Sequence, residues 1–378
     1  MNFDLSEEQQ LLSDSLSRLL GDHYAFEQRR AIAASNDGWS PQVWRQLAEL
    51  GVLALGIPES YGGLGGAAAD RMPVLQALGR ALALEPYMAS CVLGGTAVLA
   101  AGSNAQKDAL LPALASGGLR LGWAHEEEGE RHNPTWVQTR AVRQGDGWRL
   151  DGSKPLVLNA NAANQLVVSA RVAGKVDWTE GLAPLLVDPK AGGVALRHYR
   201  LIDDTPAAQL TLHGAAAQAL RDPAHGALQL AAISAALDAG TAPACAGMVG
   251  AMEAAFDLTT AYVNTRKQFG KLIGEYQALR HRVAEMKVCL DVARTMAMAA
   301  PVAADSAGSP DAATDLPRAK LVTGRQARQL GQAAIQSHGG IGMTEEYAVG
   351  HCLRHIHVLD QLFGDVDAQA ARLARMGA

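Results

Sequence analysis

The sequence predicts an α+β protein, mainly α-helical, with three parts in the order helices, β-strands, helices. Three observations predict this class. Apolar residues recur at helical spacing near both ends of the chain, and short alternating stretches with Gly-Asp-Gly and Asp-Gly turns fill the middle. A chain of 378 residues can also support two or three domains. We therefore expect an N-terminal helical domain at 1–118, a β-barrel or sandwich domain at 119–223 and a C-terminal four-helix bundle at 224–378.

The first part carries clear helix-start signals. Ser6 is followed three residues later by Gln9, as in a capping box, and leucines then recur at helical spacing. Ser40 is an expected N-cap with Pro41 at the first helical position. Two further helical stretches are expected at about 69–84 and 89–115.

The middle part alternates apolar and polar residues over short stretches, which is typical of half-buried strands. The stretches are VQTRAV (137–142), WRL (148–150), QLVVSAR (165–171), APLLVD (183–188) and AAQLTLH (207–213).

The last part returns to helical spacing. One buried stripe of a long helix is expected from Leu279, Val283, Met286, Leu290 and Ala293. Residues 301–317, rich in Pro, Gly and Asp, are expected to form a loop between helices. Residues 226–252 carry a single charge, Asp238, but consist largely of Ala and Gly, which contribute little to membrane insertion. We expect a buried small-residue helix there.

Composition limits the class of function. Hydrophobic residues make up 48% and charged residues 19% of the chain, which indicates a soluble globular protein. A formal charge of −5 gives no electrostatic footprint for nucleic acid. The four cysteines are widely spaced, and the polar N-terminus has no secretory signal, so we expect reduced thiols, a cytoplasmic location and no membrane partner.

Two linked motifs near the C-terminus are the most informative feature. RKQFG (266–270) leads into IGEYQALRHRVAEM (273–286), and QSHGGIGMTEEY (336–347) runs on to Arg354. The wording and spacing of these motifs resemble the C-terminal helical domain of the flavin-dependent acyl-CoA dehydrogenases. The order of helices, strands and helices is also that of this family, so the resemblance covers essentially the whole chain.

The resemblance implies α,β-desaturation of an acyl-CoA thioester with FAD as cofactor. Such a reaction needs a flavin site, an acyl-CoA channel and a carboxylate base. In the family, an Arg reaches the FAD pyrophosphate of a neighbouring subunit, an aromatic side chain packs on the adenine side, two Gln side chains contact the cofactor, and a Gly pair lets the backbone approach it. The matching residues here are Arg266, Phe269, Gln277, Gln336, Gly339 and Gly340.

The second half of the flavin site departs from the family pattern. A Thr-Glu-Pro segment and a Ser normally border the flavin ring, and the corresponding stretch here is AHEEEGERHN (124–133). Glu126 stands in the Thr place and His132 near the Ser place, while Leu156 and Leu158 replace a Trp and a Thr. The resemblance therefore implies that this chain lacks donors to the flavin ring in its own β domain.

The base position departs most sharply. Phe363 stands where the family carries its catalytic Glu, and a second family location for the base falls at about Gly240. Asp365 and Asp367 are nearby carboxylates, either of which could replace the base, but Asp at these places also favours the N-terminus of the final helix. Asp238 lies where the family often contacts CoA, although Thr241 replaces the Arg that commonly accompanies it.

Two clusters could suggest a metal. They are the histidines at 351, 355 and 357, and His125 beside three glutamates at 126–128. Neither offers an evident set of four ligands with further support, so we expect no metal.

Three hypotheses follow. The leading one is a base-lacking subunit that resembles the small subunit of bacterial pimeloyl-CoA-type dehydrogenases and completes the FAD site in a hetero-oligomer with a larger subunit. The second is a homotetrameric acyl-CoA dehydrogenase, a homo-oligomer that uses Asp365 as a displaced base. The third is a non-enzymatic scaffold that binds CoA esters or partner helices.

Overall fold

The computed structural model describes residues 6–221, 226–306 and 310–377. The chain forms two compact units. Unit 1 consists of Met1–Ala31, Ala67–Ala83 and Thr241–Ala378, and unit 2 of Ile32–Gly66 and Leu84–Gly240.

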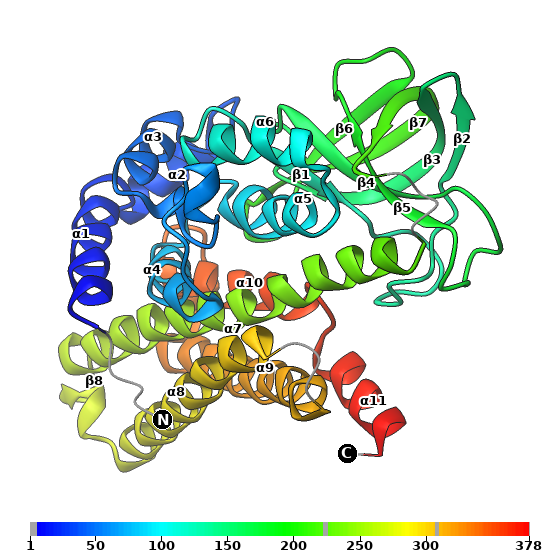
Figure 1. The fold of residues 1–378 in the computed structure, drawn as a ribbon. Coiled ribbons are helices and arrows are strands. Elements are labelled where there is room, and N and C mark those ends of the chain that lie inside the picture. Colours follow the sequence, from blue (N-terminus) through cyan, green and yellow to red (C-terminus); the bar gives the residue numbers. More distant parts are fainter. Residues whose placement is uncertain (1–5, 222–225, 307–309, 378) are drawn as a thin grey trace. The chain divides into compact units, whose positions relative to one another are not determined.

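Unit 1 is helical and centres on a bundle of long helices (Figure 1). Its helices include α1 (Glu7–His23), α4 (Met72–Ala81), α8 (Gln277–Asp305), α9 (Pro310–His338), α10 (Ala348–Gln361) and α11 (Val366–Met376). Helix α7 (Gly226–Thr265) enters unit 1 at Thr241, and α2 (Phe26–Ala34) leaves it after Ala31. A two-stranded hairpin, β8 (Lys267–Gln268) and β9 (Lys271–Leu272), connects α7 to α8 through the short 3-10 helix Ile273–Glu275.

The core of unit 1 explains the small residues of α7. A Cβ placed on Gly79 of α4 would collide with the backbone of Gly247, and one on Gly250 would collide with the backbone of Gln76. Small residues therefore let α4 and α7 approach closely. By length and composition α7 could span a bilayer, but 72% of its apolar window is buried inside the fold, as in a core helix.

The predicted stripe on α8 is largely correct. Met286, Leu290 and Ala293 are buried in the bundle core, whereas Leu279 and Val283 are half-buried near the start of the helix.

Unit 2 contains a seven-stranded sheet. Its strands are β1 (Leu121–Ala124), β2 (Arg140–Gln144), β3 (Gly147–Leu158), β4 (Gln165–Arg171), β5 (Leu182–Val187), β6 (Val194–Arg200) and β7 (Pro206–Ala219). The pairings β4–β2, β2–β3, β3–β7, β7–β5 and β5–β4 form a closed ring, so the sheet is a barrel. Its helices are α3 (Pro41–Glu49), α5 (Gly95–Ala101) and α6 (Asn104–Ala115), with a π-helical turn at Met88–Gly94.

The predicted fold class is confirmed: helices precede and follow a central β region. The N-caps at Ser6 and Ser40 are also confirmed, because each hydroxyl accepts a backbone N–H at 3.2 Å, from Gln9 and Val43 respectively.

The loop predicted at 301–317 is wrong over most of its length, and its residues 307–309 lie outside the described part of the chain. Helix α8 continues to Asp305, and α9 begins at Pro310. Proline is tolerated at the first position of a helix, where its missing N–H has no intrahelical partner, and the alanines of this stretch favour helix.

Candidate functional site

The RKQFG motif forms a projecting hairpin at the end of α7. Residues Lys267 and Leu272 pair across it, and the amide of Ile273 donates to the Arg266 carbonyl oxygen at 2.9 Å. Phe269 and Gly270 occupy the two turn positions with φ values of 52° and 84°, as a two-residue turn with left-handed backbone requires. The aromatic ring of Phe269 is thereby placed at the tip, where it is 92% exposed.

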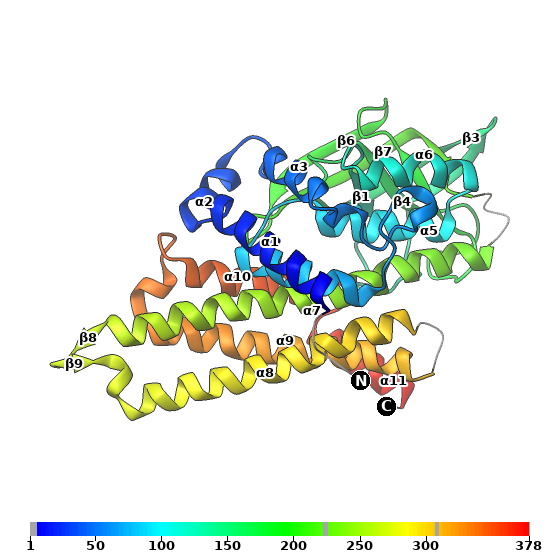
Figure 2. The same ribbon diagram turned by 60° about the vertical axis from the view of Figure 1, so that its left-hand side comes forward.

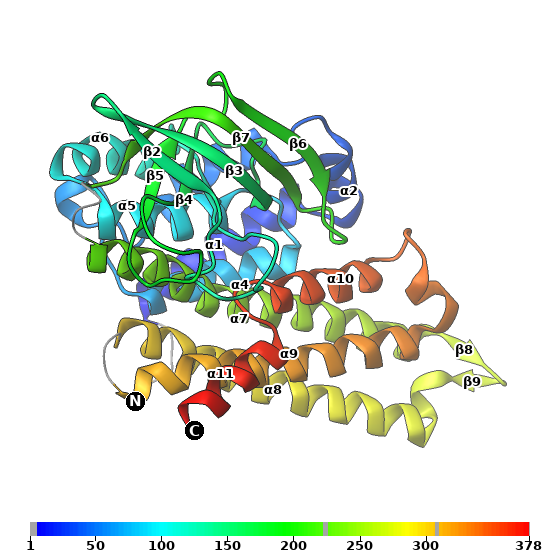
Figure 3. The same ribbon diagram turned by 90° about the vertical axis from the view of Figure 1, so that its right-hand side faces the viewer.

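The diglycine motif begins where α9 ends. Gly339 has φ 67°, and a Cβ added at Gly339 or Gly340 would meet no atom within 4 Å. The backbone of this pair therefore faces open space. Figures 2 and 3 show that the hairpin and the α9–α10 connection lie at the same end of the helical bundle.

Three aromatic rings, one from α7 and two from the 336–347 motif, meet beside the hairpin, and sequence reasoning missed their contact. Tyr262 stacks on His338 with ring centroids 4.5 Å apart, and Tyr347 lies 5.0 Å from His338. Tyr262 is one helical turn before Arg266, and His338 directly precedes Gly339. That spacing was the available signal, but which rings meet depends on tertiary packing.

The segment after the diglycine is fixed by an ion pair. Both carboxylate oxygens of Glu345 accept from the Arg354 guanidinium at 2.8 Å, and this hydrogen bonding lowers the pKa of the Glu345 carboxyl.

We call the hairpin, the diglycine segment and their neighbouring glutamines the cradle. Its predicted binding residues Arg266, Gln277 and Gln336 are all exposed, as are both glycines. Cationic, amide and aromatic side chains lie beside exposed backbone, which is the chemistry that a dinucleotide needs for its phosphates and base. The cradle residues therefore fit one end of FAD, and the structure brings all six predicted residues into the same unit.

The turn between α10 and α11, where the family carries its base, is internally bonded. Lys320 donates to the carbonyl oxygens of Leu359 and Asp360, both at 2.8 Å. Gln369 donates to the Phe363 carbonyl oxygen at 2.8 Å. Phe363 and Gly364 have left-handed φ values of 60° and 91°.

Asp365 is the N-cap of α11. Its carboxylate accepts from the amide of Ala368 at 2.9 Å and from the side-chain amide of Gln361 at 3.4 Å. The capping interpretation of this residue is therefore the one that the structure shows.

A carboxylate that sequence reasoning missed lies in the same region. Asp360 is 1% exposed, and among the described residues neither of its carboxylate oxygens has a hydrogen-bond partner. The Arg328 guanidinium is 3.7 Å away. Burial raises the pKa of Asp360, while the charges of Lys320 and Arg328 partly oppose the shift.

In unit 2, the segment that aligns with the flavin loop is built around acidic side chains. Glu127 forms a buried ion pair with Lys154 at 2.7 Å and accepts from the Thr139 hydroxyl at 2.6 Å. Glu126 is half-buried, and burial raises the pKa of its carboxyl. Leu158 is buried and Leu156 half-buried. The Thr139 hydroxyl is thus bonded to Glu127, and the leucine side chains carry no hydrogen-bond donor.

The histidine clusters behave as packing residues. His351 contacts the Arg29 guanidinium at 3.5 Å and the Glu345 carbonyl oxygen at 3.1 Å. Burial lowers the pKa of His125 to about 3, so this ring is neutral near pH 7. Within the described ranges, no group of three or more His, Cys, Asp or Glu residues could hold a metal ion.

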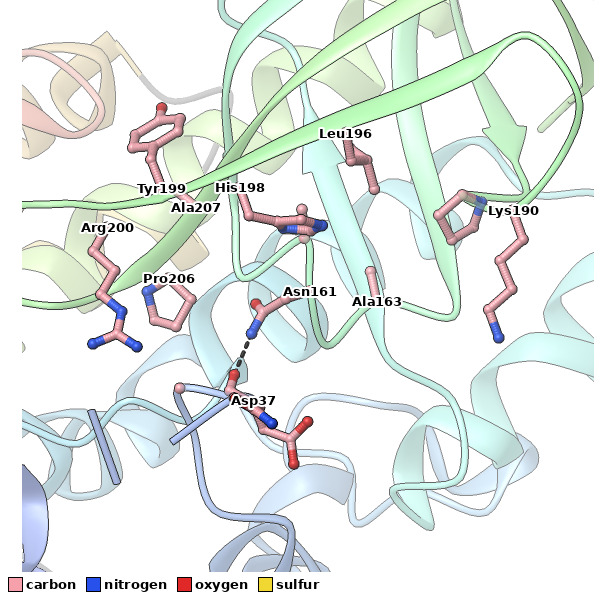
Figure 4. A pocket seen from close by; sticks show the side chains of 14 residues that line it. Asp37, Asn161, Ala163, Lys190, Leu196, His198, Tyr199, Arg200, Pro206 and Ala207 are labelled. Atoms are coloured by element: carbon pink, nitrogen blue, oxygen red, sulfur yellow. Dashed lines mark hydrogen bonds between the residues drawn. The ribbon is translucent and has the colours of Figure 1, made fainter. Parts of the chain in front are cut away.

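Asp238, the predicted contact to CoA, is half-buried on the unit 2 part of α7. Thr241, which begins the unit 1 part of that helix, is buried. A concavity of about 610 Å³ is lined by residues that include Asn161, Lys190 and Arg200, and a side-chain amide of Asn161 bonds the Asp37 carbonyl oxygen (Figure 4). None of the predicted site residues lines it.

Comparison with known proteins identifies the class. Residues 6–118 match the family model of the acyl-CoA dehydrogenase N-terminal domain, and residues 230–377 match that of the acyl-CoA dehydrogenase C-terminal domain. The chain therefore belongs to the acyl-CoA dehydrogenase family. Enzymes of this family are FAD-dependent oxidoreductases that act on acyl-CoA, which confirms the resemblance and the expected cofactor.

Individual relatives span the whole chain. It is 30% identical to the acyl-CoA dehydrogenase IpdE2 of Mycolicibacterium smegmatis over 98% of both chains, and 28% identical to the probable acyl-CoA dehydrogenase YngJ of Bacillus subtilis over 99% of both. Among solved structures, a variant of the Tcur3481–Tcur3483 steroid ACAD matches with a TM-score of 0.87 and 28% identity, covering 98% of this chain and 97% of that one. The ChsE4–ChsE5 complex of Mycobacterium tuberculosis matches with a TM-score of 0.87 and 25% identity, covering 99% and 98%.

Proposed function

We propose that this chain is the base-lacking subunit of a heteromeric acyl-CoA dehydrogenase and that its cradle completes the FAD site of a larger partner subunit. The observation that carries the proposal is the state of Phe269. An aromatic side chain that is 92% exposed lies at the tip of a projecting hairpin, beside the exposed Arg266. The hairpin therefore offers an aromatic ring and a guanidinium, which suit the base and the phosphates of a dinucleotide held by another subunit.

The α10–α11 turn supports the absence of a base. A base must reach the α-carbon proton of the substrate with a free carboxylate. Phe363 supplies none, and the Asp365 carboxylate is engaged as a helix cap. This argues against the homotetrameric alternative, in which Asp365 would be the displaced base.

The β-domain residues support a FAD site that is shared between two chains. The acidic segment around Glu126 and the apolar side chains of Leu156 and Leu158 replace flavin-ring donors, whereas the cradle keeps its full set. A subunit that only completes the FAD site of a partner needs the cradle but not the donors to the flavin ring. Two similar solved structures carry names of paired chains, ChsE4–ChsE5 and Tcur3481–Tcur3483, which agrees with a heteromer.

The bound flavin supplies the hydride acceptor for α,β-desaturation of an acyl-CoA thioester. In this assembly, Arg266 would hold the pyrophosphate, Phe269 would lie on the adenine side, and Gln277 and Gln336 would supply side-chain amides. The backbone at Gly339 and Gly340 approaches the cofactor. Asp238 is our proposed contact to the CoA moiety.

We also keep the three-domain division at 1–118, 119–223 and 224–378 and a cytoplasmic location as proposals. The described cysteines are all free and buried, as expected in a reducing compartment.

Purification of the chain with and without a co-expressed larger subunit tests the function. The chain alone is expected to be colourless, and the assembled pair to be yellow with FAD present. Arg266→Met should lower the FAD affinity of the pair by at least about tenfold, because a charge-assisted bidentate contact is lost. Arg318→Met is the matched control, since Arg318 is an exposed arginine on α9 outside the cradle.

The native mass and the absorption spectrum distinguish the three hypotheses for the function of the chain. Stoichiometric FAD and turnover by the lone chain would refute the base-lacking role. A colourless chain that binds CoA esters in a thermal-shift assay, and that gains no flavin from any co-expressed family member, would instead identify a scaffold.

A further inference from the structure

The two motifs of the cradle come from distant parts of the chain, and three rings join them. Tyr262 lies in the last turn of α7, where its carbonyl oxygen accepts from the Arg266 amide at 2.9 Å. His338 is the last residue of α9, and Tyr347 directly precedes α10. The end of α7, the end of α9 and the start of α10 therefore each contribute a ring to the same cluster.

The rings have the geometry of a stabilising contact. The planes of Tyr262 and His338 are inclined by 27° at a centroid distance of 4.5 Å, and Tyr262 and Tyr347 meet edge-on at 6.3 Å. Aromatic pairs at such distances add stabilisation beyond the area they bury. His338 is only 4% exposed, and its Nδ1 donates to the Ala334 carbonyl oxygen at 2.8 Å, which fixes the orientation of the ring.

The diglycine segment has no side chains of its own that could hold it beside the hairpin. Gly339 and Gly340 have no neighbours where a side chain would be, and the hairpin consists of two residue pairs. The aromatic cluster links the last turn of α7, which leads into Arg266, to the residue that directly precedes the diglycine, and its centre, His338, is buried.

We propose that Tyr262, His338 and Tyr347 are positioning residues, which hold the hairpin and the diglycine segment in register for one dinucleotide. None of them needs to touch the nucleotide. Bidentate phosphate recognition tolerates little displacement, so a loosened hairpin weakens binding even though every contacting residue is still present. The link to FAD rests on the proposed function. The connection of the two motifs through Tyr262, His338 and Tyr347, which we call the joint, does not.

Comparing Tyr262→Leu with Tyr262→Phe separates the contribution of the aromatic ring from that of the hydroxyl. The first removes the stack, and the second keeps it. Tyr199→Leu is the matched control, because Tyr199 is a partly exposed tyrosine of unit 2 that lies outside the cradle.

The first measurement is hydrogen exchange at the Ile273 amide in the lone chain. Tyr262→Leu should speed exchange there by at least about tenfold, because the hairpin opens locally, while both other variants should match the wild type. Wild-type exchange in Tyr262→Leu would overturn the joint. If that variant fails to fold, Tyr347→Leu carries the same expectations.

The second measurement is the FAD dissociation constant of the assembled pair. We expect Tyr262→Leu to raise it by about tenfold and Tyr262→Phe to restore it to within about twofold of the wild type. Equal affinity of Tyr262→Leu and wild type would overturn the positioning role. A wild-type pair without FAD would refute the proposed function instead, and the exchange result would still judge the joint.

Discussion

Two regions of unit 1 contrast sharply, although each corresponds to part of one active site in the family. In the cradle, the binding side chains are exposed and the Gly339–Gly340 backbone is open. In the α10–α11 turn, buried or capping side chains bind the carbonyl oxygens of Leu359, Asp360 and Phe363. A region that receives a ligand leaves its polar groups available, and a region that has become structural bonds them internally. The contrast agrees with the proposed function, in which the cradle binds a cofactor and the α10–α11 turn carries no base.

The largest expected effect comes from removing the lysine that bonds the turn. Lys320→Met leaves the buried carbonyl oxygens of Leu359 and Asp360 without their charged donor. We expect the free energy of unfolding to fall by about 2–5 kcal/mol, because each buried acceptor left without a partner costs about 1–3 kcal/mol. Urea denaturation measures it. Lys287→Met, which breaks an exposed pair with Asp291, should cost at most about 1 kcal/mol.

The next largest effect tests whether Asp365 is a cap. Asp365→Ala should lower the free energy of unfolding by about 1 kcal/mol, because the Ala368 amide loses its acceptor. Asp365→Asn keeps an acceptor oxygen and should cost less. Acyl-CoA-dependent bleaching of the flavin in the assembled pair should survive both changes, and its loss in Asp365→Asn would restore the residue as a base.

A smaller effect should depend on pH. Burial raises the pKa of Asp360 in the folded chain above its unfolded value. The folded state therefore binds this proton more tightly than the unfolded state does. The resulting contribution to the free energy of unfolding is fully present below the unfolded pKa and is lost as pH rises through the folded pKa. Asp360→Asn should gain stability relative to the wild type over that rise, and no relative change between acidic and neutral pH would contradict the assigned shift.

The smallest expected effect belongs to the cradle. Phe269→Ala should change the free energy of unfolding of the lone chain by no more than about 0.5 kcal/mol, since the ring buries almost nothing. The same change should weaken FAD binding by the assembled pair. A large loss of stability in the lone chain would mean that the hairpin is structural, and the contrast between the two regions would disappear.

The sequence predicted local features well. The caps at Ser6 and Ser40 depend on neighbours within a few positions. The helix–strand–helix order also followed from spacing alone. The loop predicted at 301–317 failed because Pro and Gly were taken as breaks, although Pro310 starts a helix and Pro301 and Pro317 lie inside helices.

The site was only partly predictable. The cradle residues were found through a resemblance whose motifs are short and continuous. Lys320 and the turn it binds are about 40 residues apart in the chain, and the partner of a buried cation cannot be read from spacing. The ring cluster around His338 was missed for the same reason, as was the closure of the barrel through the pairing of β4 with β5.

The exposed ring at the tip of the hairpin also matters for how a cell must make this protein. A surplus copy shows a bare aromatic group on a protruding arm, which invites sticking to unrelated molecules. Under the proposed function, we expect the two polypeptides to be synthesised in matched amounts, so that each hairpin is covered soon after it forms.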